Sequence, residues 1–134
     1  MNRYFLDTNI LLDFLGNRQP FGKYALEILN KSRIKEWELW TSDNSILTSL
    51  NIISKEIGEA ESRTKISRLI NFLEIQPTQK APIQQALDSN IKDLEDGVQH
   101  FCAYSIPGLE GIITRNKKDF KTNQIPVFEP WEVV

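Results

Sequence analysis

Residues 3–15, RYFLDTNILLDFL, change from a strand pattern to a helix pattern at one carboxylate, Asp7. The stretch RYFL before it is short, apolar and compatible with a β-strand. The apolar positions after it repeat at the spacing of one helix face, namely Ile10, Leu11, Phe14 and Leu15. An Asp at such a junction is a favoured N-cap, yet an acid beyond the carboxyl end of a strand can also bind a metal ion. This stretch alone leaves both roles open for Asp7.

The rest of the chain alternates strand patterns with helix patterns. Further strands are predicted at residues 37–42 (WELWTS), 74–77 (EIQP, expected to be buried), 111–114 (GIIT) and within the tail 125–134. Helices are predicted at residues 22–31, 45–58, 61–73, 82–90 and 92–106. Ser45 is the expected N-cap of the second of these helices, and Gly58 is its expected end. This alternation predicts an α/β fold with a central, mostly parallel sheet, in a single domain over residues 1–134.

The composition fits a soluble globular domain and narrows the possible partners. Of the 134 residues, 40% are hydrophobic and 25% are charged, which is typical of folded domains. The chain has 16 Lys and Arg against 18 Asp and Glu, so nucleic acid would have to bind a local positive patch. A single Cys and a single His exclude a disulfide framework and a Cys/His zinc site. Without a signal-peptide pattern or a long apolar run, we expect a cytoplasmic protein with no membrane partner.

Acids also stand at two later places that the predicted topology brings to the same edge of the sheet as Asp7. Residues 93–97, DLEDG, begin a predicted helix, and residues 115–120, RNKKDF, follow the predicted strand GIIT. Each acid has an ordinary explanation, because a helix N-terminus favours negative charge. Taken together the acids can converge, and close carboxylates need a cation among them. Oxygen ligands favour Mg²⁺ or Mn²⁺, whose chemistry includes phosphodiester hydrolysis by a metal-activated water.

Three sequence blocks follow one another as FLDTNILLD (5–13), DLEDGVQHFCA (93–103) and GIITRNKKDF (111–120). In this order and at these spacings they resemble PIN-domain proteins, and they are most similar to the VapC-like toxin ribonucleases. The resemblance implies a three-layer α/β sandwich and a Mg²⁺- or Mn²⁺-dependent endoribonuclease, the toxin of a type II toxin–antitoxin pair. It also implies an RNA substrate, an antitoxin protein as partner and a homodimer. The alternative is a catalytically weak or inactive PIN-fold module that binds RNA or another protein.

The resemblance further implies roles for individual side chains. Asp7 and Asp96 would hold the metal ion directly. The rest of the catalytic set would be Asn116, as a neutral metal ligand or a residue that holds a water, and Asp119, which would complete the acidic pocket or orient a water. The supporting positions are Asn9, Asn51, Glu95 and Thr114. Asn51 and Asn116 stand where many members of the family have an acid, and Glu95 is placed to compensate.

The remaining features are the basic rim of the site, the single His and one alternative enzyme class. A basic rim that contacts RNA is expected at Arg115, Lys117 and Lys118. His100 follows Asp96 by one helical turn and is expected to be a structural side chain rather than a metal ligand. Phosphatases of the haloacid dehalogenase type also begin with a strand that ends in Asp. Their chemistry requires a second Asp two residues later, and the presence of Asn9 at that position disfavours this alternative.

Overall fold

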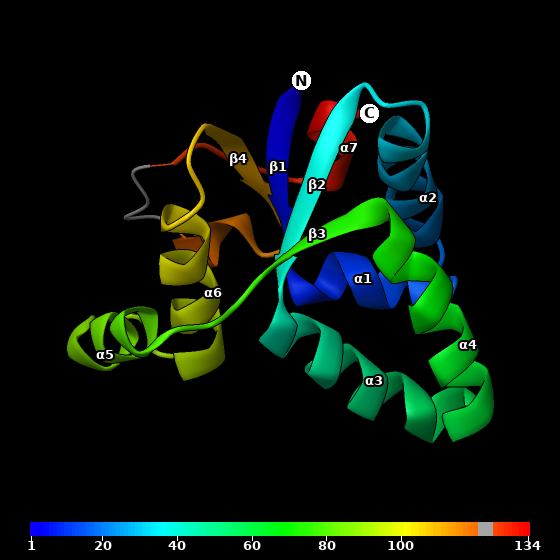
Figure 1. The fold of residues 1–134 in the computed structure, drawn as a ribbon, viewed down its shortest axis with the longest axis horizontal. Helices are drawn as coiled ribbons and strands as arrows, with labels where there is room; N and C mark the ends of the chain where they lie inside the picture. The colour runs from blue at the N-terminus through cyan, green and yellow to red at the C-terminus, as the bar shows by residue number, and fades with distance from the viewer. Residues whose placement is uncertain (121–124) are drawn as a thin grey trace.

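The computed structural model describes residues 1–120 and 125–134, with the backbone alone at Asp119. Within these residues, five parallel strands form one sheet in the order β3-β2-β1-β4-β5 (Figure 1). The predicted α/β class and parallel central sheet are therefore confirmed. No helix in the described part of the chain is long and apolar enough to cross a membrane.

The strands and helices alternate along the chain. The strands are β1 (Asn2–Leu6), β2 (Trp37–Ser42), β3 (Leu73–Gln76), β4 (Leu109–Ile113) and β5 (Val127–Phe128). The α-helices are α1 (Thr8–Leu15), α2 (Phe21–Arg33), α3 (Asp43–Ile57), α4 (Glu59–Leu69), α5 (Lys80–Asp88), α6 (Leu94–Tyr104) and α7 (Pro130–Val133). Two short 3₁₀ helices are η1 (Ile70–Phe72) and η2 (Lys117–Phe120).

Three details of the predicted elements are wrong. The helix expected from Ser45 begins at Asp43, because the side chain of Ser42 caps it and accepts a hydrogen bond of 2.9 Å from Ser45 N. The helix expected over 61–73 ends four residues earlier, where the chain passes through η1 into β3. The strand expected to be buried at 74–77 is an edge strand instead, and its Ile75 is 38% exposed.

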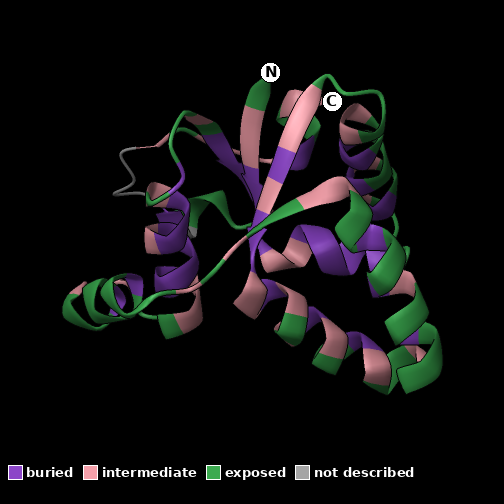
Figure 2. Ribbon diagram, in the orientation of Figure 1, coloured by how far each residue is buried: buried purple, intermediate pink, exposed green. Residues whose placement is uncertain are grey.

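Helices cover both faces of the sheet and give three layers, with separate buried clusters on the two faces (Figure 2). The cluster beneath α1 to α4, named here the major core, consists of Leu6, Ile10, Leu11, Leu15, Ala25, Ile28, Leu29, Leu39, Ile53, Ile66, Leu69 and Ile113. The cluster beneath α6, named here the minor core, consists of Phe5, Ala103, Ile106 and Ile112. Neighbouring residues of β1 and β4 thus point to opposite faces, as side chains alternate along a strand.

The strand order reverses between β1 and β4, which is where parallel sheets commonly bind ligands. The chain passes from β1 to β2 and β3 on one side, and then returns to place β4 on the other side of β1. Ligands of parallel sheets bind beyond the carboxyl ends of the strands, where the strand order reverses in this way. Asp7 and Thr114 each follow one of these two strands, and Asp7 N donates a hydrogen bond of 3.0 Å to the carbonyl oxygen of Ile113.

Candidate active site

Asp7 is buried at this switch point, with 4% of its surface exposed. Its Oδ1 accepts a hydrogen bond of 2.8 Å from the backbone N of Thr8 and so caps α1. Its Oδ2 accepts bonds of 2.7 Å from Thr114 Oγ1 and 3.3 Å from Asn9 Nδ2. Asp7 therefore caps a helix and is also held in a defined orientation, so the two roles that the sequence left open are compatible.

Thr114 joins the start of α1 to the segment that follows β4. Its buried hydroxyl receives hydrogen bonds from Asn9 Nδ2 at 3.2 Å and from the backbone N of Asn116 at 3.0 Å. Asn9 Oδ1 in turn accepts a bond of 3.2 Å from the backbone N of Arg115. The structure thus brings Asn9 and Thr114 together around the Asp7 carboxylate, and it places the exposed side chain of Asn116 just beyond them.

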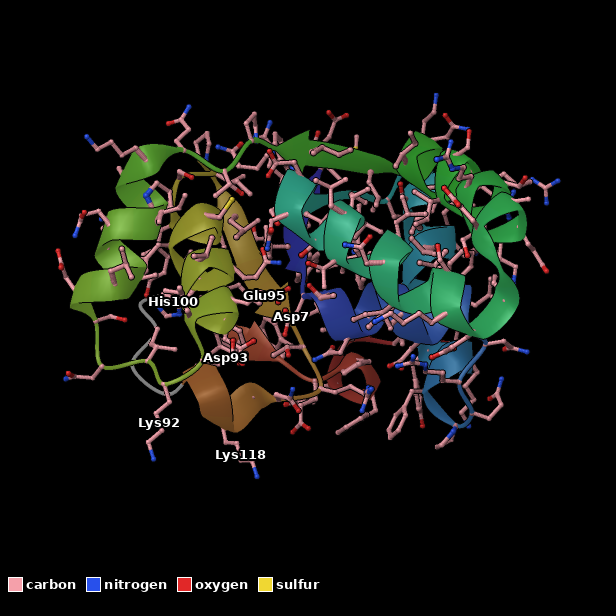
Figure 3. The ribbon with its side chains drawn as sticks, turned by 90° about the horizontal axis from the view of Figure 1, so that it is seen from below. Asp7, Lys92, Asp93, Glu95, His100 and Lys118 are labelled. Carbon is pink, nitrogen blue, oxygen red and sulfur yellow. The ribbon has the colours of Figure 1, made fainter. Side chains whose placement is uncertain are left out.

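The first turn of α6 carries the second group of acids. Asp93 is the N-cap, and its Oδ1 accepts a bond of 3.0 Å from the backbone N of Asp96. Glu95 and Asp96 are half-buried, and one turn later Gln99 Nε2 donates to Thr8 Oγ1 at 3.2 Å. This contact places the acidic turn of α6 beside the start of α1 (Figure 3). The positive end of the helix dipole stabilises the negative charge of that turn.

Two predicted residues stand apart from this arrangement. Asn51 is exposed on α3, and by helix geometry it lies about 120° around the axis from Ser45. Ser45 is the α3 residue that faces the site, because its hydroxyl lies 2.8 Å from Thr8 Oγ1. Asn51 therefore lies on a different face of α3 from Ser45, and its supporting role stays a prediction. The side chain of Asp119 lies outside the described part of the chain, so its role stays a prediction.

Arg115 is held by contacts within the protein. Its Nε donates to Asp13 Oδ2 at 2.6 Å, and its Nη2 donates to Asp13 Oδ1 at 3.1 Å. The guanidinium carbon also lies 4.3 Å from the centre of the Phe21 ring, in a cation–π contact. Asp13 is 1% exposed; burial raises the pKa of its carboxyl, and the hydrogen bond from Arg115 partly lowers it. Arg115 thus forms an ion pair with Asp13 while its side chain stays 25% exposed, and the expected contact with RNA stays a prediction.

The two lysines of the expected rim differ in their surroundings. Lys117 Nζ lies 3.2 Å from Glu132 Oε1, in an ion pair that is partly exposed. Lys118 is exposed on η2, and its side chain extends away from the core into solvent (Figure 3). Lys118 is therefore better placed than Lys117 to meet a phosphate group.

Several residues near the site were not singled out from the sequence. Asp13 had a usable signal, because an acid inside the apolar run ILLDFL must be buried with a partner. Gln99, Ser42 and Ser45 are also buried and hydrogen-bonded to one another. No local pattern distinguishes these three from ordinary surface polar residues, because their burial results from contacts between distant segments.

The donors around the site favour a hard cation. Within the described residues, no group of three or more His, Cys, Asp or Glu side chains is placed to hold a metal ion. The oxygen donors at the two ends of the site are the carboxylates of Asp7, Asp96 and Glu95 and the amide of Asn116. Mg²⁺ is commonly bound by one or two carboxylates together with waters and substrate phosphate. The residues present fit that mode of binding, and the arrangement is suited to phosphodiester chemistry.

Comparison with known proteins gives concordant matches in sequence. A family model described as PIN domain matches residues 3–118. Ribonuclease VapC1 of Aquifex aeolicus (strain VF5) is 31% identical over 132 residues, which covers 93% of this chain and 88% of that protein.

Solved structures match along almost the whole chain. The DNA-bound VapBC of Salmonella typhimurium matches with a TM-score of 0.73 at 16% identity, covering 97% of this chain and 99% of that chain. A toxin–antitoxin complex from Klebsiella pneumoniae matches with a TM-score of 0.63 at 25% identity, covering 95% of this chain and 97% of that chain. The likeness to the Salmonella structure is one of fold.

Proposed function

The chain belongs to the PIN domain family, and on this premise we propose that it is a metal-dependent endoribonuclease, the toxin of a type II toxin–antitoxin pair. The observation that carries the proposal is the Asp7 carboxylate. It lies buried at the switch point of the sheet, is oriented by three hydrogen-bond donors, and stands beside the acidic first turn of α6. The ribonuclease function of the relative from Aquifex aeolicus supports the same assignment.

In this proposal Asp7 and Asp96 hold a divalent cation, Mg²⁺ or Mn²⁺, with Asn116 as a neutral ligand. When bound, the cation supplies an activated water and balances the charge that develops on the phosphate. Asn9 and Thr114 fix the Asp7 carboxylate through the contacts at 3.3 Å and 2.7 Å, so the carboxylate keeps one orientation. This orientation reduces the rearrangement that binding and reaction would otherwise require.

The remaining residues of the proposed site act at its edges. Glu95, half-buried beside Asp96, supplies a second carboxylate on α6, and Asp119 completes the acidic pocket. Lys118 contacts a phosphate of the bound RNA from its exposed position on η2. A local contact of this kind is required, because the formal net charge of −2 gives no general attraction for RNA.

We also propose that the chain forms a homodimer and is inhibited by an antitoxin protein. The toxin–antitoxin complex from Klebsiella pneumoniae supports the antitoxin as a partner. Co-expression provides the test. Growth arrest by the chain alone, relieved by the protein encoded beside its gene, would support the partnership, and arrest that this protein does not relieve would oppose it.

The nuclease is tested with Asp7→Asn, because Asn retains a helix-capping oxygen while removing the negative charge. The control is Asp88→Asn, which neutralises an exposed carboxylate at the end of α5. Purified proteins are incubated with a panel of structured RNAs in Mg²⁺, in Mn²⁺ and in EDTA. We expect metal-dependent cleavage by the wild type and the control, and a loss of at least about 100-fold in Asp7→Asn.

Two outcomes would contradict the nuclease. Cleavage that survives both EDTA and Asp7→Asn would place the chemistry elsewhere. Binding of RNA without cleavage in either metal would favour the non-catalytic module.

A further inference from the structure

A buried polar network ties α6 to three other elements that surround the site. Its centre is Gln99, which is 1% exposed and therefore cannot exchange its hydrogen bonds with solvent. Gln99 Oε1 accepts a bond of 2.7 Å from Ser42 Oγ at the end of β2. Gln99 Nε2 donates to Thr8 Oγ1 at 3.2 Å and to Ser45 Oγ at the start of α3.

We propose that Gln99 is a positioning residue that sets the separation between the Asp7 and Asp96 carboxylates. The proposal rests on the function proposed above, because it assigns to both acids the same metal ion. It concerns the geometry between them, whereas Asn9 and Thr114 orient Asp7 alone.

The first step of the argument is the position of Gln99 along α6. Asp96 precedes it by three residues, so the two side chains lie about 60° apart around the helix axis and one turn apart along it. Glu95 precedes it by four residues, which places it about 40° away on the other side. Any shift of the Gln99 side chain relative to its partners therefore moves both acids of the first turn together.

The second step is the position of its partner on α1. Thr8 follows Asp7 directly, and its backbone N donates the 2.8 Å bond that caps α1 through the Asp7 carboxylate. The hydroxyl of the same residue receives the bond from Gln99. One residue thus contacts both the Asp7 carboxylate and the helix that carries Asp96.

The third step is the chemistry of the side chain. Only an amide offers an acceptor and two N–H donors at the end of one side chain, and Gln99 uses both kinds. The hydroxyls of Ser45 and Thr8 are also in contact with each other at 2.8 Å. The network therefore connects α6 to β2, α1 and α3 at once. An apolar or shorter side chain at position 99 cannot form these hydrogen bonds and so cannot hold the same distances between the elements.

The fourth step is the small size of the apolar cluster between α6 and the sheet. Within the described residues, the minor core beneath this helix has four members, against twelve in the major core. Apolar packing is non-directional and tolerates small shifts, whereas hydrogen bonds fix distances. The network is therefore the part of the α6 interface that can define where its first turn stands.

The experiment compares Gln99→Met, which keeps the length and removes the hydrogen bonds, with the control Gln85→Met on the exposed face of α5. The Mn²⁺ affinity of each protein is measured without RNA by titration calorimetry, alongside the thermal midpoint and the kcat and KM for RNA cleavage. We expect Gln99→Met to weaken Mn²⁺ binding about tenfold, as loss of groups that orient metal ligands does. The kcat should fall, the KM for RNA should change less than about twofold, and the control should match the wild type.

A second variant, Thr8→Val, keeps the test usable if Gln99→Met fails to fold. It removes the hydroxyl at the other end of the contact and leaves the backbone N that caps α1. It should weaken Mn²⁺ binding in the same direction. In the double variant the loss should be smaller than the sum of the two single losses, because both changes remove the bond between Gln99 and Thr8.

The outcomes separate this inference from the proposed function. If the wild type binds Mn²⁺ and cleaves RNA while Gln99→Met lowers only the thermal midpoint, Gln99 is a structural residue and the positioning role is overturned. If the wild type neither binds Mn²⁺ nor cleaves RNA, the proposed function fails, and the positioning role fails with it.

Discussion

Among the described residues, the major core beneath α1 to α4 has twelve buried members and the minor core beneath α6 has four. The proposed site draws one acid from each side of this boundary. Asp7 caps α1, which packs into the major core, and Asp96 stands on α6 above the minor core. The two halves of the site are therefore held differently, because the second adds the polar network around Gln99 to a smaller apolar cluster against the sheet.

The largest expected effect comes from a matched pair of residues on β4. Ile113 belongs to the major core and Ile112 to the minor core, and both are fully buried neighbours on the same strand. Replacement of Ile113 by Ala should lower the free energy of unfolding by about 4 kcal/mol. Replacement of Ile112 by Ala should cost only about 2 kcal/mol, because its partly exposed neighbours can move into the space.

Urea unfolding of the two variants under identical conditions measures this difference. Equal losses of unfolding free energy would show that the two cores are equally rigid. They would contradict the proposed difference between the two faces of the sheet.

The next effect concerns the ion pair between Arg115 and Asp13. Arg115→Ala leaves a carboxylate with 1% exposure without its ion-pair partner, so it should lower the free energy of unfolding by about 3 kcal/mol near neutral pH. Burial already raises the pKa of the Asp13 carboxyl, and loss of Arg115 raises that pKa further. The folded variant then binds a proton more readily than the unfolded chain, so its stability rises as the pH falls.

Urea unfolding at about pH 8 and about pH 5 checks the sign of this prediction. The penalty of Arg115→Ala should be smaller at the lower pH, and it should lose its pH dependence in a background with Asp13→Asn. If Arg115→Ala lowered the free energy of unfolding equally at both pH values, the loss would not arise from the charge of the Asp13 carboxylate.

The smallest expected effect arises on the minor-core side, at His100. This residue is 3% exposed, and its ring is stacked on Phe120 with a centroid distance of 5.8 Å, which confirms the expected structural role. Burial lowers the pKa of His100 below its ordinary value. The unfolded chain therefore binds a proton more readily, and stability should fall as the pH drops below about 6.5.

The chain contains a single His, so the comparison of wild type with His100→Phe isolates this effect. The wild type should lose stability between about pH 7.5 and pH 5.5, and the variant should lose less. Equal losses would indicate that the acid-sensitive groups lie elsewhere.

The sequence predicted the parts of the fold that depend on local patterns. The α/β order, the parallel sheet and the position of Asp7 after β1 follow from short apolar runs and the residues that end them. The start of α3 was misplaced because Ser42 and Ser45 are equally good capping residues by type. Only the structure shows which of the two hydroxyls accepts the bond from the helix.

The parts of the site that were missed depend on distant contacts. Arg115 and Asp13 are 102 residues apart in the sequence, so a basic loop could not be told from half of an ion pair. The supporting role of Asn51 stays a prediction, because α3 carries polar residues on several faces and the pattern does not show which face meets the site. Gln99 lies inside one of the quoted blocks, but its partners come from three other elements.

The bond from Thr114 to Asp7 has a consequence for the synthesis of the protein, since it joins residues that are 107 positions apart. The hydroxyl of Thr114, one of the donors that orient the first acid, exists only after the ribosome has added the 107 residues that follow Asp7. The pairing of β1 with β4 and the clamp between Asp13 and Arg115 have the same requirement. An unfinished chain therefore has no assembled site.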